Sequence, residues 1–428
     1  MTIALGVLGC GTVGQGTVLL AHRRAEKIQH LTGFRPYVKR ILVRDLEKTR
    51  SPEIDRSKLT NQAYDILDDP EIQVIVETIG GIEPARTYIL EALRRGKHVV
   101  TANKDLIALY GAEILKVAND VGVEVLYEAA VGGAIPLVGP LQENLTANEV
   151  TDLKGIINGT TNFILTQMNE TGAEFADALA EAQALGYAEA DPSSDIDGLD
   201  AARKLTILAS IAFHARVELA DVQVEGIRHI TARDVQYARE LGCVVKLLAS
   251  GTDRNGRLSL RVRPTLIPLA HPLAHVSNSY NALFVRGDAA GDLMFFGRGA
   301  GSMPTASAVV GDIISLLRNI RLGVAGSPEN RLYLQKRVVP DEMLYQHYVR
   351  FSVSDKPGVF ARIAQLFGDA GISMETVLQK RVEQGQAEIV VVTHSIPAHR
   401  MDELCDALAQ VQQVQKVACV MPLEALSE

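Results

Sequence analysis

Charged side chains gather in residues 186–204, which read GYAEADPSSDIDGLDAARK. The segment holds Glu189 and several aspartates, and it ends in a predicted helix that carries Lys204. Asp200 and Lys204 are four residues apart, so they share one face of that helix and can hold each other in position. This arrangement makes the segment a candidate catalytic site. An acid-rich loop of this kind can also be solvated surface or a helix cap, and the segment alone leaves these interpretations open.

A second lysine stands where ligands commonly bind. The tetrapeptide TANK at 101–104 follows a predicted strand at 98–101, which puts Lys104 at the carboxyl edge of a parallel sheet. Open α/β sheets bind their ligands at that edge. Without further context, Lys104 fits an ordinary surface lysine equally well.

The turn after the first predicted strand, GCGTVG at 9–14, has the G-x-G-x-x-G spacing and leads into a helix. Gly9 allows a tight turn, Gly11 lets the backbone approach a pyrophosphate, and Gly14 lets the helix pack against the strand. The amide-rich helix N-terminus then faces the anion. A glycine-rich turn without a ligand is the alternative. The residues predicted to bind a dinucleotide here are Gly9, Gly11, Thr12, Val13 and Gly14.

The residues after the second strand indicate which nucleotide binds. An acidic residue at the end of this strand would bind the ribose hydroxyl of NAD. Here Arg44 takes the first position beyond the predicted strand and Lys48 follows, so a guanidinium can receive the 2′-phosphate of NADP. These charges can also be solvated surface, and Asp45 keeps NAD use possible. The pattern favours NADP and leaves NAD open.

Short apolar runs alternate with helical segments up to residue 135, which predicts a doubly wound parallel sheet of the Rossmann type over 1–135. The expected strands are 3–9, 37–43, 73–78, 98–101 and 123–128, with helices starting at 13 and 84. Over 136–320 strict alternation is lost, so we expect an α+β domain for substrate binding and dimerisation. Its expected strands are 156–157, 260–262 and 283–285, and its expected helices are 174–185, 200–213 and 232–248.

Residues 348–428 form a separate pattern. A strand at 348–353, the turn DKPG at 355–358 and a helix with one apolar face come first. Strands at 373–380 and 386–394, a helix from 398 and a strand at 415–421 complete a βαββαβ order. This order predicts a ferredoxin-like domain. The charged residues 321–347 are expected to connect it to the rest of the chain.

Composition limits the possible classes of protein. The chain has 428 residues, of which 47% are hydrophobic and 22% charged, so several folded domains are expected. A net charge of −8 argues against a nucleic-acid or membrane partner. No apolar run approaches the roughly 18 residues of a membrane span, and the N-terminus lacks the basic leader of a signal peptide. The 4 cysteines have no metal-ligand spacing, which argues against a zinc site or a disulfide framework and favours the cytoplasm.

Taken together, the motifs resemble the homoserine dehydrogenase family. The shared blocks follow the family's order along nearly the whole chain, and the block at 186–205 is specific to the family. Since no kinase-like region precedes residue 1, we expect the monofunctional form, in which DKPGVFARIA at 355–364 opens an ACT domain. The other shared blocks are the glycine turn, TANK at 101–104, YEAAVGGAIP at 127–136, NGTTNFIL at 158–165 and GRGAGSMPTASAVVGDI at 297–313.

The resemblance implies reversible NAD(P)-dependent reduction of L-aspartate 4-semialdehyde to L-homoserine, in threonine, methionine and isoleucine biosynthesis. It makes Lys204 the residue that gives or takes the proton at the substrate oxygen, and it puts Lys104 beside the nicotinamide and the substrate. Glu189 would take the substrate ammonium group, and Asp200 would orient Lys204 or the reacting hydroxyl. The resemblance also implies substrate contacts from Tyr187, Asn158 and Thr160, and cofactor contacts from Thr101 and Gly301.

The same resemblance implies a monovalent-cation site that would fix the hinge between the domains. Its residues are Glu128, Val131, Gly133 and Ile135. One carboxylate and several backbone carbonyls are hard oxygen ligands, which suit Na⁺ or K⁺ better than zinc. The alternative is a tight glycine turn in which backbone amides satisfy Glu128.

An ACT domain implies regulation by an amino acid, and threonine, an end product of this branch, is the expected effector. The turn at 355–358 has a glycine and a helix N-terminus that suit a carboxylate. The alternative is that the domain only holds a homodimer or homotetramer together.

Two other functions fit parts of the sequence. Aspartate-semialdehyde dehydrogenase handles the same aldehyde, but it needs an activated nucleophilic cysteine, and none of the cysteines has a catalytic context. A sensor protein that kept the folds and lost the chemistry is the second. The intact set of Lys104, Glu189, Asp200 and Lys204 argues against it.

Overall fold

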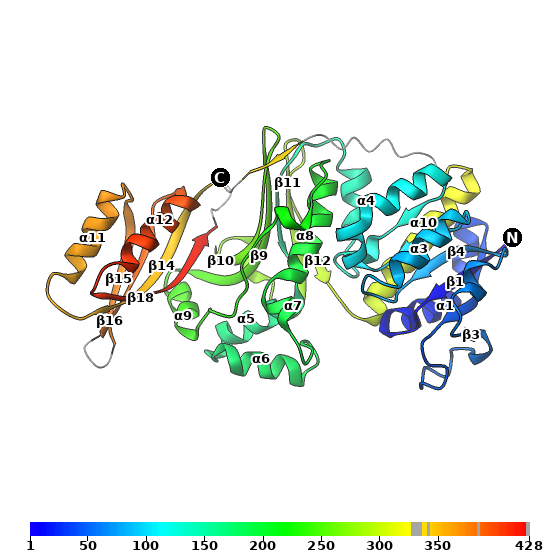
Figure 1. Ribbon diagram of the computed structural model, residues 1–428, viewed down its shortest axis with the longest axis horizontal. Helices are drawn as coiled ribbons and strands as arrows, with labels where there is room; N and C mark the ends of the chain where they lie inside the picture. The colour runs from blue at the N-terminus through cyan, green and yellow to red at the C-terminus, as the bar shows by residue number, and fades with distance from the viewer. Residues whose placement is uncertain (327–335, 340–342, 383–385, 425–428) are drawn as a thin grey trace. The chain divides into compact units, whose positions relative to one another are not determined.

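The computed structural model describes residues 1–326, 336–339, 343–382 and 386–424, and Figure 1 shows it as a ribbon. Residues 327–335 and 340–342 of the expected connector at 321–347 lie outside these residues. The chain divides into two compact units that do not follow chain order. The first unit comprises Met1–Leu153, Arg203–Asp221 and Asn281–Lys336, and the second comprises Lys154–Ala202, Val222–Tyr280 and Arg337–Glu428.

The first unit is built on a six-stranded sheet in the order β3-β2-β1-β4-β5-β6. Every neighbouring pair in this sheet is parallel. Order and direction are those of a dinucleotide-binding Rossmann sheet, so the predicted fold class is confirmed here. The strands are β1 Thr2–Leu8, β2 Arg35–Leu42, β3 Leu59–Thr60, β4 Ile72–Glu77, β5 His98–Thr101 and β6 Val125–Leu126.

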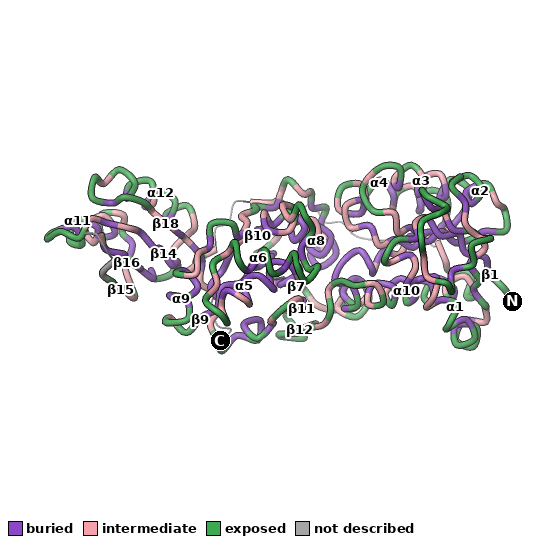
Figure 2. The backbone as a smooth tube through the Cα atoms, turned by 90° about the horizontal axis from the view of Figure 1, so that it is seen from below, coloured by how far each residue is buried: buried purple, intermediate pink, exposed green. Residues whose placement is uncertain are grey.

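Helices cover this sheet because they bury apolar stripes against the almost wholly buried central strands. Val7, Val74 and Val76 are fully buried, and residues of α1 and α10 pack in the same core. Figure 2 shows the strands as buried and the outer helix faces as exposed. The helices assigned wholly to this unit are α1 Thr12–Thr32, α2 Tyr64–Leu67, α3 Ala85–Arg94, α4 Lys104–Val121 and α10 Ser302–Leu322. Strands β11 Tyr280–Gly287 and β12 Gly291–Arg298 also lie in it, except for Tyr280.

Strand β7 Val150–Ile156 and helix α8 Leu199–Ala212 contribute residues to both units. In the second unit, the long antiparallel pair β9 and β10 forms the centre, and helices α5 and α9 pack against β9 and each other. The elements of its central part are α5 Gly159–Thr171, α6 Phe175–Ala184, α7 Ser193–Ile196, β8 Gln223–Val224, α9 Ala232–Glu240, β9 Cys243–Arg254 and β10 Arg257–Pro268.

The C-terminal part of the second unit has the predicted βαββαβ order. Its strands lie in the order β18-β14-β16-β15, and their apolar faces form a core with both helices. Strand β18 continues this sheet onto β10, through the pair Leu266 and Leu423. The elements are β13 Arg337–Val338, β14 Leu344–Ser354, α11 Val359–Asp369, β15 Met374–Val382, β16 Gln386–Thr393, β17 Ile396–Pro397, α12 Ala398–Ala409 and β18 Val414–Leu423.

One predicted helix is wrong in extent. The helix expected over 232–248 ends at Glu240, and the chain turns at Gly242, where φ is +70°. Cys243 then begins β9, not a continuation of the helix. The β-branched pair Val244 and Val245 favours a strand, and the helical apolar spacing continued across the turn by chance.

Candidate active site

The glycine turn has the geometry that a pyrophosphate requires. Gly9 has φ of +103°, and a Cβ at Gly14 would collide with the Gly9 carbonyl oxygen. A Cβ at Gly11 would meet nothing within 4 Å, so the space above this residue is open to a ligand. Gly11 also begins α1 without a side-chain cap, which leaves the first-turn amides directed at that space. These features fit a bound dinucleotide.

Two residues at the end of β4 support this turn, and the sequence analysis did not find them. Thr78 donates its hydroxyl to the Gly9 carbonyl at 3.0 Å. Glu77 is fully buried and accepts the Thr101 hydroxyl at 2.6 Å and the Ile79 amide at 2.7 Å. Burial raises the pKa of Glu77, and these hydrogen bonds oppose the shift. A glutamate that ends a buried strand, in VIVET, was the available signal.

The loop after β2 presents the predicted NADP-selecting charges. Arg44 and Lys48 are both exposed, as a group that binds a phosphate from solvent must be. Asp45 uses Oδ1 to accept the backbone amides of Glu47 and Lys48, at 2.8 and 3.2 Å. One of its two carboxylate oxygens is thus occupied by hydrogen bonds within its own loop.

Arg50 in the same loop is a further candidate that the prediction left out. Its guanidinium closes the loop by donating to the carbonyls of Asp45 and Lys48, at 2.7 and 2.9 Å. It also lies beside the glycine turn: burial raises the pKa of the Cys10 thiol, and Arg50 partly opposes this. Its Nε is buried with no hydrogen-bond partner, which suits an anion bound at the turn.

Gly301 stands next to the glycine turn in this unit. It has φ of +123° and begins α10, and the following Ser302 donates its hydroxyl to the Thr12 carbonyl at 2.7 Å. The structure thus brings this predicted cofactor residue to the start of α1.

Lys104 is the first residue of α4, at the carboxyl end of β5 as predicted. The Asn103 side chain caps the helix by accepting the Leu106 amide at 3.2 Å, and the Asn103 backbone amide donates to Thr101 Oγ1 at 3.0 Å. Asp105 pairs with Arg203 at 3.2 Å. This ion pair joins the neighbours of the two candidate catalytic lysines, Lys104 and Lys204, within the first unit.

In the second unit, Asn158 organises the acidic segment. It caps α5 by accepting the Thr161 amide, and its Nδ2 donates to Asp200 Oδ2 at 2.8 Å and to Asp195 Oδ1 at 2.7 Å. Asp200 is buried, with 5% of its surface exposed. Its carboxylate is therefore fixed one helical turn before Lys204 on α8.

Thr160 and Tyr187 hold the loop that carries Glu189. The Thr160 hydroxyl donates to the Tyr187 carbonyl at 2.7 Å, and the Tyr187 ring packs on Phe163 with centroids 4.7 Å apart. Glu189 itself is exposed, and its backbone carbonyl accepts from Gln183 at 3.1 Å. The structure brings together the predicted catalytic residue Asp200 and the predicted substrate residues Asn158, Thr160 and Tyr187, by direct contacts or shared elements.

In the predicted cation site, the Glu128 carboxylate already accepts hydrogen bonds from the backbone. Glu128 accepts the amides of Leu137, Val138 and Gly139 at 2.6, 2.9 and 2.7 Å. Among the described residues, no hydrogen bond reaches the carbonyls of the other candidate ligands, so backbone oxygens are the groups left for an ion. Those candidates are Val131, Gly133 and Ile135. Asp312 lies beside this turn, accepts the Glu128 amide at 2.9 Å, and has its pKa raised by burial and by the Glu128 charge.

The cysteines do not form a nucleophilic site. All 4 are free thiols, and burial raises the pKa of each. A raised pKa keeps a thiol protonated and unreactive near neutral pH. Within the described ranges, no three His, Cys, Asp or Glu side chains are grouped as a metal site.

A cavity of about 350 Å³ lies at the turn between β14 and α11 in the C-terminal part. Gly358 begins α11 there with φ of +86°. The cavity has the size of a small-molecule site. Its lining includes Ser354, Asp355, Lys356, Pro357, Gly358 and Gln379.

None of the helices among the described residues is both long and apolar enough to cross a bilayer.

Comparison with known proteins covers most of the chain. Family profiles match residues 9–128 as "Homoserine dehydrogenase, NAD binding domain", 136–314 as "Homoserine dehydrogenase" and 347–412 as "ACT domain". A homoserine dehydrogenase of Bacillus subtilis is 42% identical over 425 residues, covering 99% of this chain and 98% of its own. The crystal structure of a homoserine dehydrogenase from Thiobacillus denitrificans superposes with a TM-score of 0.94 at 41% identity, covering 99% and 98% of the two chains. A hyperthermophilic archaeal homoserine dehydrogenase in complex with NADPH matches with a TM-score of 0.62 at 28% identity, covering 74% of this chain and 97% of its own.

Proposed function

The chain belongs to the homoserine dehydrogenase family, and we propose that Lys204, Lys104 and Asp200 carry its chemistry. It is an oxidoreductase of amino-acid biosynthesis that acts on a CH–OH group and binds NAD(P) through its Rossmann-type domain. The substrates are L-homoserine and L-aspartate 4-semialdehyde. The observation that best supports these roles concerns Asp200. It is buried on α8, the helix that bears Lys204, and its carboxylate accepts a hydrogen bond from Asn158.

The bound cofactor supplies or takes the hydride at the substrate carbon. In the reductive direction Lys204 gives a proton to the carbonyl oxygen of the semialdehyde, and in the oxidative direction it takes the hydroxyl proton of homoserine. Asp200 orients Lys204 or the reacting hydroxyl. Lys104 lies beside the nicotinamide and the substrate, and Glu189 takes the substrate ammonium group, with Tyr187, Asn158 and Thr160 shaping the site.

NADP is the proposed cofactor, with NAD as a second one. The exposed Arg44 and Lys48 support this choice, and the match to a relative solved with NADPH agrees with it. Replacing Arg44 with alanine removes a charged hydrogen bond to the 2′-phosphate, so Kd for NADP should rise by about 13- to 160-fold (about 1.5–3 kcal/mol) while Kd for NAD barely moves. Fluorescence titration with both nucleotides measures this. Arg24→Ala is the control, on an exposed arginine of α1. Equal losses for NADP and NAD would make Arg44 an ordinary surface charge.

A sodium or potassium ion is proposed at the turn of Glu128, held by the carboxylate of this residue and by the backbone carbonyls of Val131, Gly133 and Ile135. An ion there stabilises the folded state by binding it and not the unfolded chain. Protein dialysed against choline chloride should therefore show a rising Tm as NaCl or KCl replaces choline at constant ionic strength. The same Tm in all three salts would contradict the site.

Threonine is proposed as a feedback inhibitor that binds the cavity at 354–358. Gln379 lines this cavity, so a leucine there should raise the threonine concentration for half-inhibition by about 2- to 12-fold, the cost of one hydrogen bond, without changing kcat. Inhibition assays at saturating homoserine measure this. Gln365→Leu, on the exposed side of α11, serves as control. Full activity of the wild-type chain in millimolar threonine would refute the inhibition.

The full-length chain is the right material for that assay. A chain cut near Arg337 would lose the pairing of β18 with β10 and the buried Glu424, which accepts a hydrogen bond from the partly buried Lys154 at 2.6 Å. Loss of activity after such a cut would therefore report on stability and not on regulation.

We also propose that the chain forms a homodimer or homotetramer and is located in the cytoplasm. The proposed domain boundaries are 1–135, 136–320, 321–347 and 348–428. The free thiols support a reducing compartment. No nucleic-acid or membrane partner is proposed. Light scattering of the purified chain distinguishes dimer from tetramer.

A further inference from the structure

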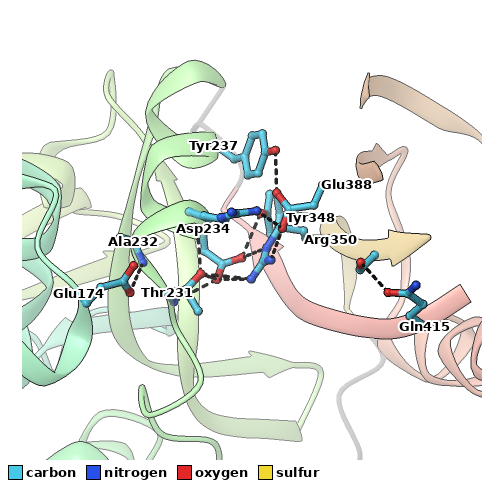
Figure 3. Close-up of polar contacts among 11 residues, drawn as sticks. Glu174, Thr231, Ala232, Asp234, Tyr237, Tyr348, Arg350, Glu388 and Gln415 are labelled. Atoms are coloured by element: carbon cyan, nitrogen blue, oxygen red, sulfur yellow. Dashed lines mark hydrogen bonds and ion pairs between the residues drawn. The ribbon is translucent and has the colours of Figure 1, made fainter. Parts of the chain in front are cut away.

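A group of polar side chains is buried where α9 meets the C-terminal sheet, and Figure 3 shows it in close-up. We call it the Arg350 cluster. Its members come from α9 or the residue before it and from strands β14 and β16, which belong to the same compact unit. They are Thr231, Asp234, Tyr237, Tyr348, Arg350 and Glu388.

Arg350 is the centre of the cluster. Its guanidinium holds Asp234 with two bonds, Nε to Oδ1 at 2.7 Å and Nη2 to Oδ2 at 2.8 Å, and reaches Glu388 with Nη1 at 3.0 Å. The exposed fractions of these side chains are 8% for Arg350, 0% for Asp234 and 8% for Glu388. Because the guanidinium is planar and bonds the carboxylate through two nitrogens, it fixes the direction of the Asp234 side chain as well as its distance.

The other members satisfy the remaining groups. Tyr348 donates to Asp234 at 3.1 Å, and Tyr237 donates to Glu388 at 3.1 Å. Burial raises the pKa of Asp234, but Arg350 outweighs this and lowers it overall, so the carboxylate stays charged. A buried polar network in which every member is paired is rigid and costly to break.

The Arg350 cluster bonds to the first turn of α9. Thr231 caps the helix, and Asp234 completes a capping box with it. Arg350 Nη2 also donates to Thr231 Oγ1 at 3.1 Å. The position of this helix start is therefore set by a strand of the C-terminal domain.

From α9 a continuous series of contacts leads to the substrate residues of the same unit. The helix packs against α5 and β9, and its Ala232 amide donates to Glu174 after α5 at 3.4 Å. On β9, Lys246 donates to Asn162 of α5 at 3.0 Å. One turn before Asn162, Asn158 caps the start of α5 and donates to Asp200.

We propose that Arg350, Asp234 and Glu388 are positioning residues through which the C-terminal domain sets α9, and through it the start of α5 with Asn158. The inference rests on the proposed role of Asn158 and Asp200 at the substrate. A buried ion pair is weak evidence for stability, because desolvation offsets most of its Coulomb energy. The two parallel bonds from Arg350 to Asp234 do fix the geometry in which the strand meets the helix. The cluster therefore serves to transmit a change in the C-terminal domain to the substrate residues.

The test replaces Arg350 with lysine, which keeps the charge but cannot bond two carboxylates in the plane of a fork. Changes within coupled networks alter affinity by about 2- to 30-fold, so KM for homoserine should rise within that range while kcat and Kd for NADP stay unchanged. Hydrogen exchange should also quicken at the amides of the first turn of α5.

Glu240→Gln is the matched control, because Lys380 itself also lies over the ring of Tyr237 in the cluster, 5.2 Å from its centroid. Glu240 pairs with Lys380 between the same helix and the same domain, at 2.5 Å, but both side chains are partly exposed, at 35% and 45%. Loss of the Glu240 charge should leave KM and exchange in α5 unchanged, since exposed pairs contribute little. If Arg350→Lys fails to fold, Glu388→Gln provides the same measurement with a smaller change, because it keeps the shape and an acceptor oxygen.

A lower Tm for Arg350→Lys with unchanged KM and unchanged exchange in α5 would show a structural role only and overturn the proposal. Exchange is measured without turnover, so it separates this outcome from a failure of the assigned substrate roles. If α5 responds but KM does not, the series of contacts is present and the role of Asn158 at the substrate is wrong, which also overturns the positioning role.

Discussion

Replacing Lys204 with alanine is expected to lower kcat by about two to four decades and to leave NADPH binding intact. The reaction must deliver or remove one proton at the substrate oxygen, and a positioned acid or base contributes about 10²- to 10⁴-fold to such a step. Because the proposed role of Lys204 is at the substrate oxygen and not at the nucleotide, Kd for NADPH should not change. Steady-state kinetics and nucleotide titration on the same preparation measure both values.

Two further variants sharpen this test. Lys204→Arg should not restore turnover, because a guanidinium stays protonated near neutral pH and cannot act as the base. Lys116→Ala removes an exposed lysine of α4 and should behave as wild type. Unchanged turnover in Lys204→Ala would overturn the assignment of the proton step.

Replacing Glu189 with glutamine is expected to raise KM for homoserine by about 13- to 160-fold. The change removes one charged hydrogen bond to the substrate ammonium, which is worth about 1.5–3 kcal/mol. Since this group is distant from the reacting carbon, kcat should change much less than KM. Initial rates over a wide range of homoserine concentrations give both values.

The matched control for that variant is Glu181→Gln, an exposed glutamate on α6 near the same loop. It should leave KM unchanged. If Glu189→Gln also leaves KM unchanged, the ammonium group is recognised elsewhere, and the exposed position of Glu189 would then reflect a solvated loop.

The glycine turn, the parallel sheet and the βαββαβ domain could be predicted because their signals are local. A G-x-G-x-x-G between a strand and a helix specifies positive φ and close packing, and the structure has both at Gly9 and Gly14. Strand 98–101 also agrees with β5 in both bounds. Periodicity and turn residues act within a few positions, so a single sequence contains them.

The partners of the supporting residues could not be predicted because they are distant in sequence. Glu77 bonds Thr101 and Asp234 bonds Arg350, pairs separated by 24 and 116 positions. The end of a buried strand singles out Glu77, but no local signal identifies Thr101 as its partner or links Asp234 to Arg350. The helix over 232–248 failed for the opposite reason, since its apolar spacing continued through Gly242, where the backbone changes direction.

We propose that this chain oxidises L-homoserine with NADP through its own proton-transferring lysine. The most direct measurement mixes the purified full-length chain with L-homoserine and NADP and follows NADPH absorbance, beside Lys204→Ala at equal concentration. We expect NADPH to form only when L-homoserine is present, and at a rate about 10²- to 10⁴-fold lower in the variant. No homoserine-dependent NADPH from the folded wild-type chain, or equal rates from both proteins, would contradict the account.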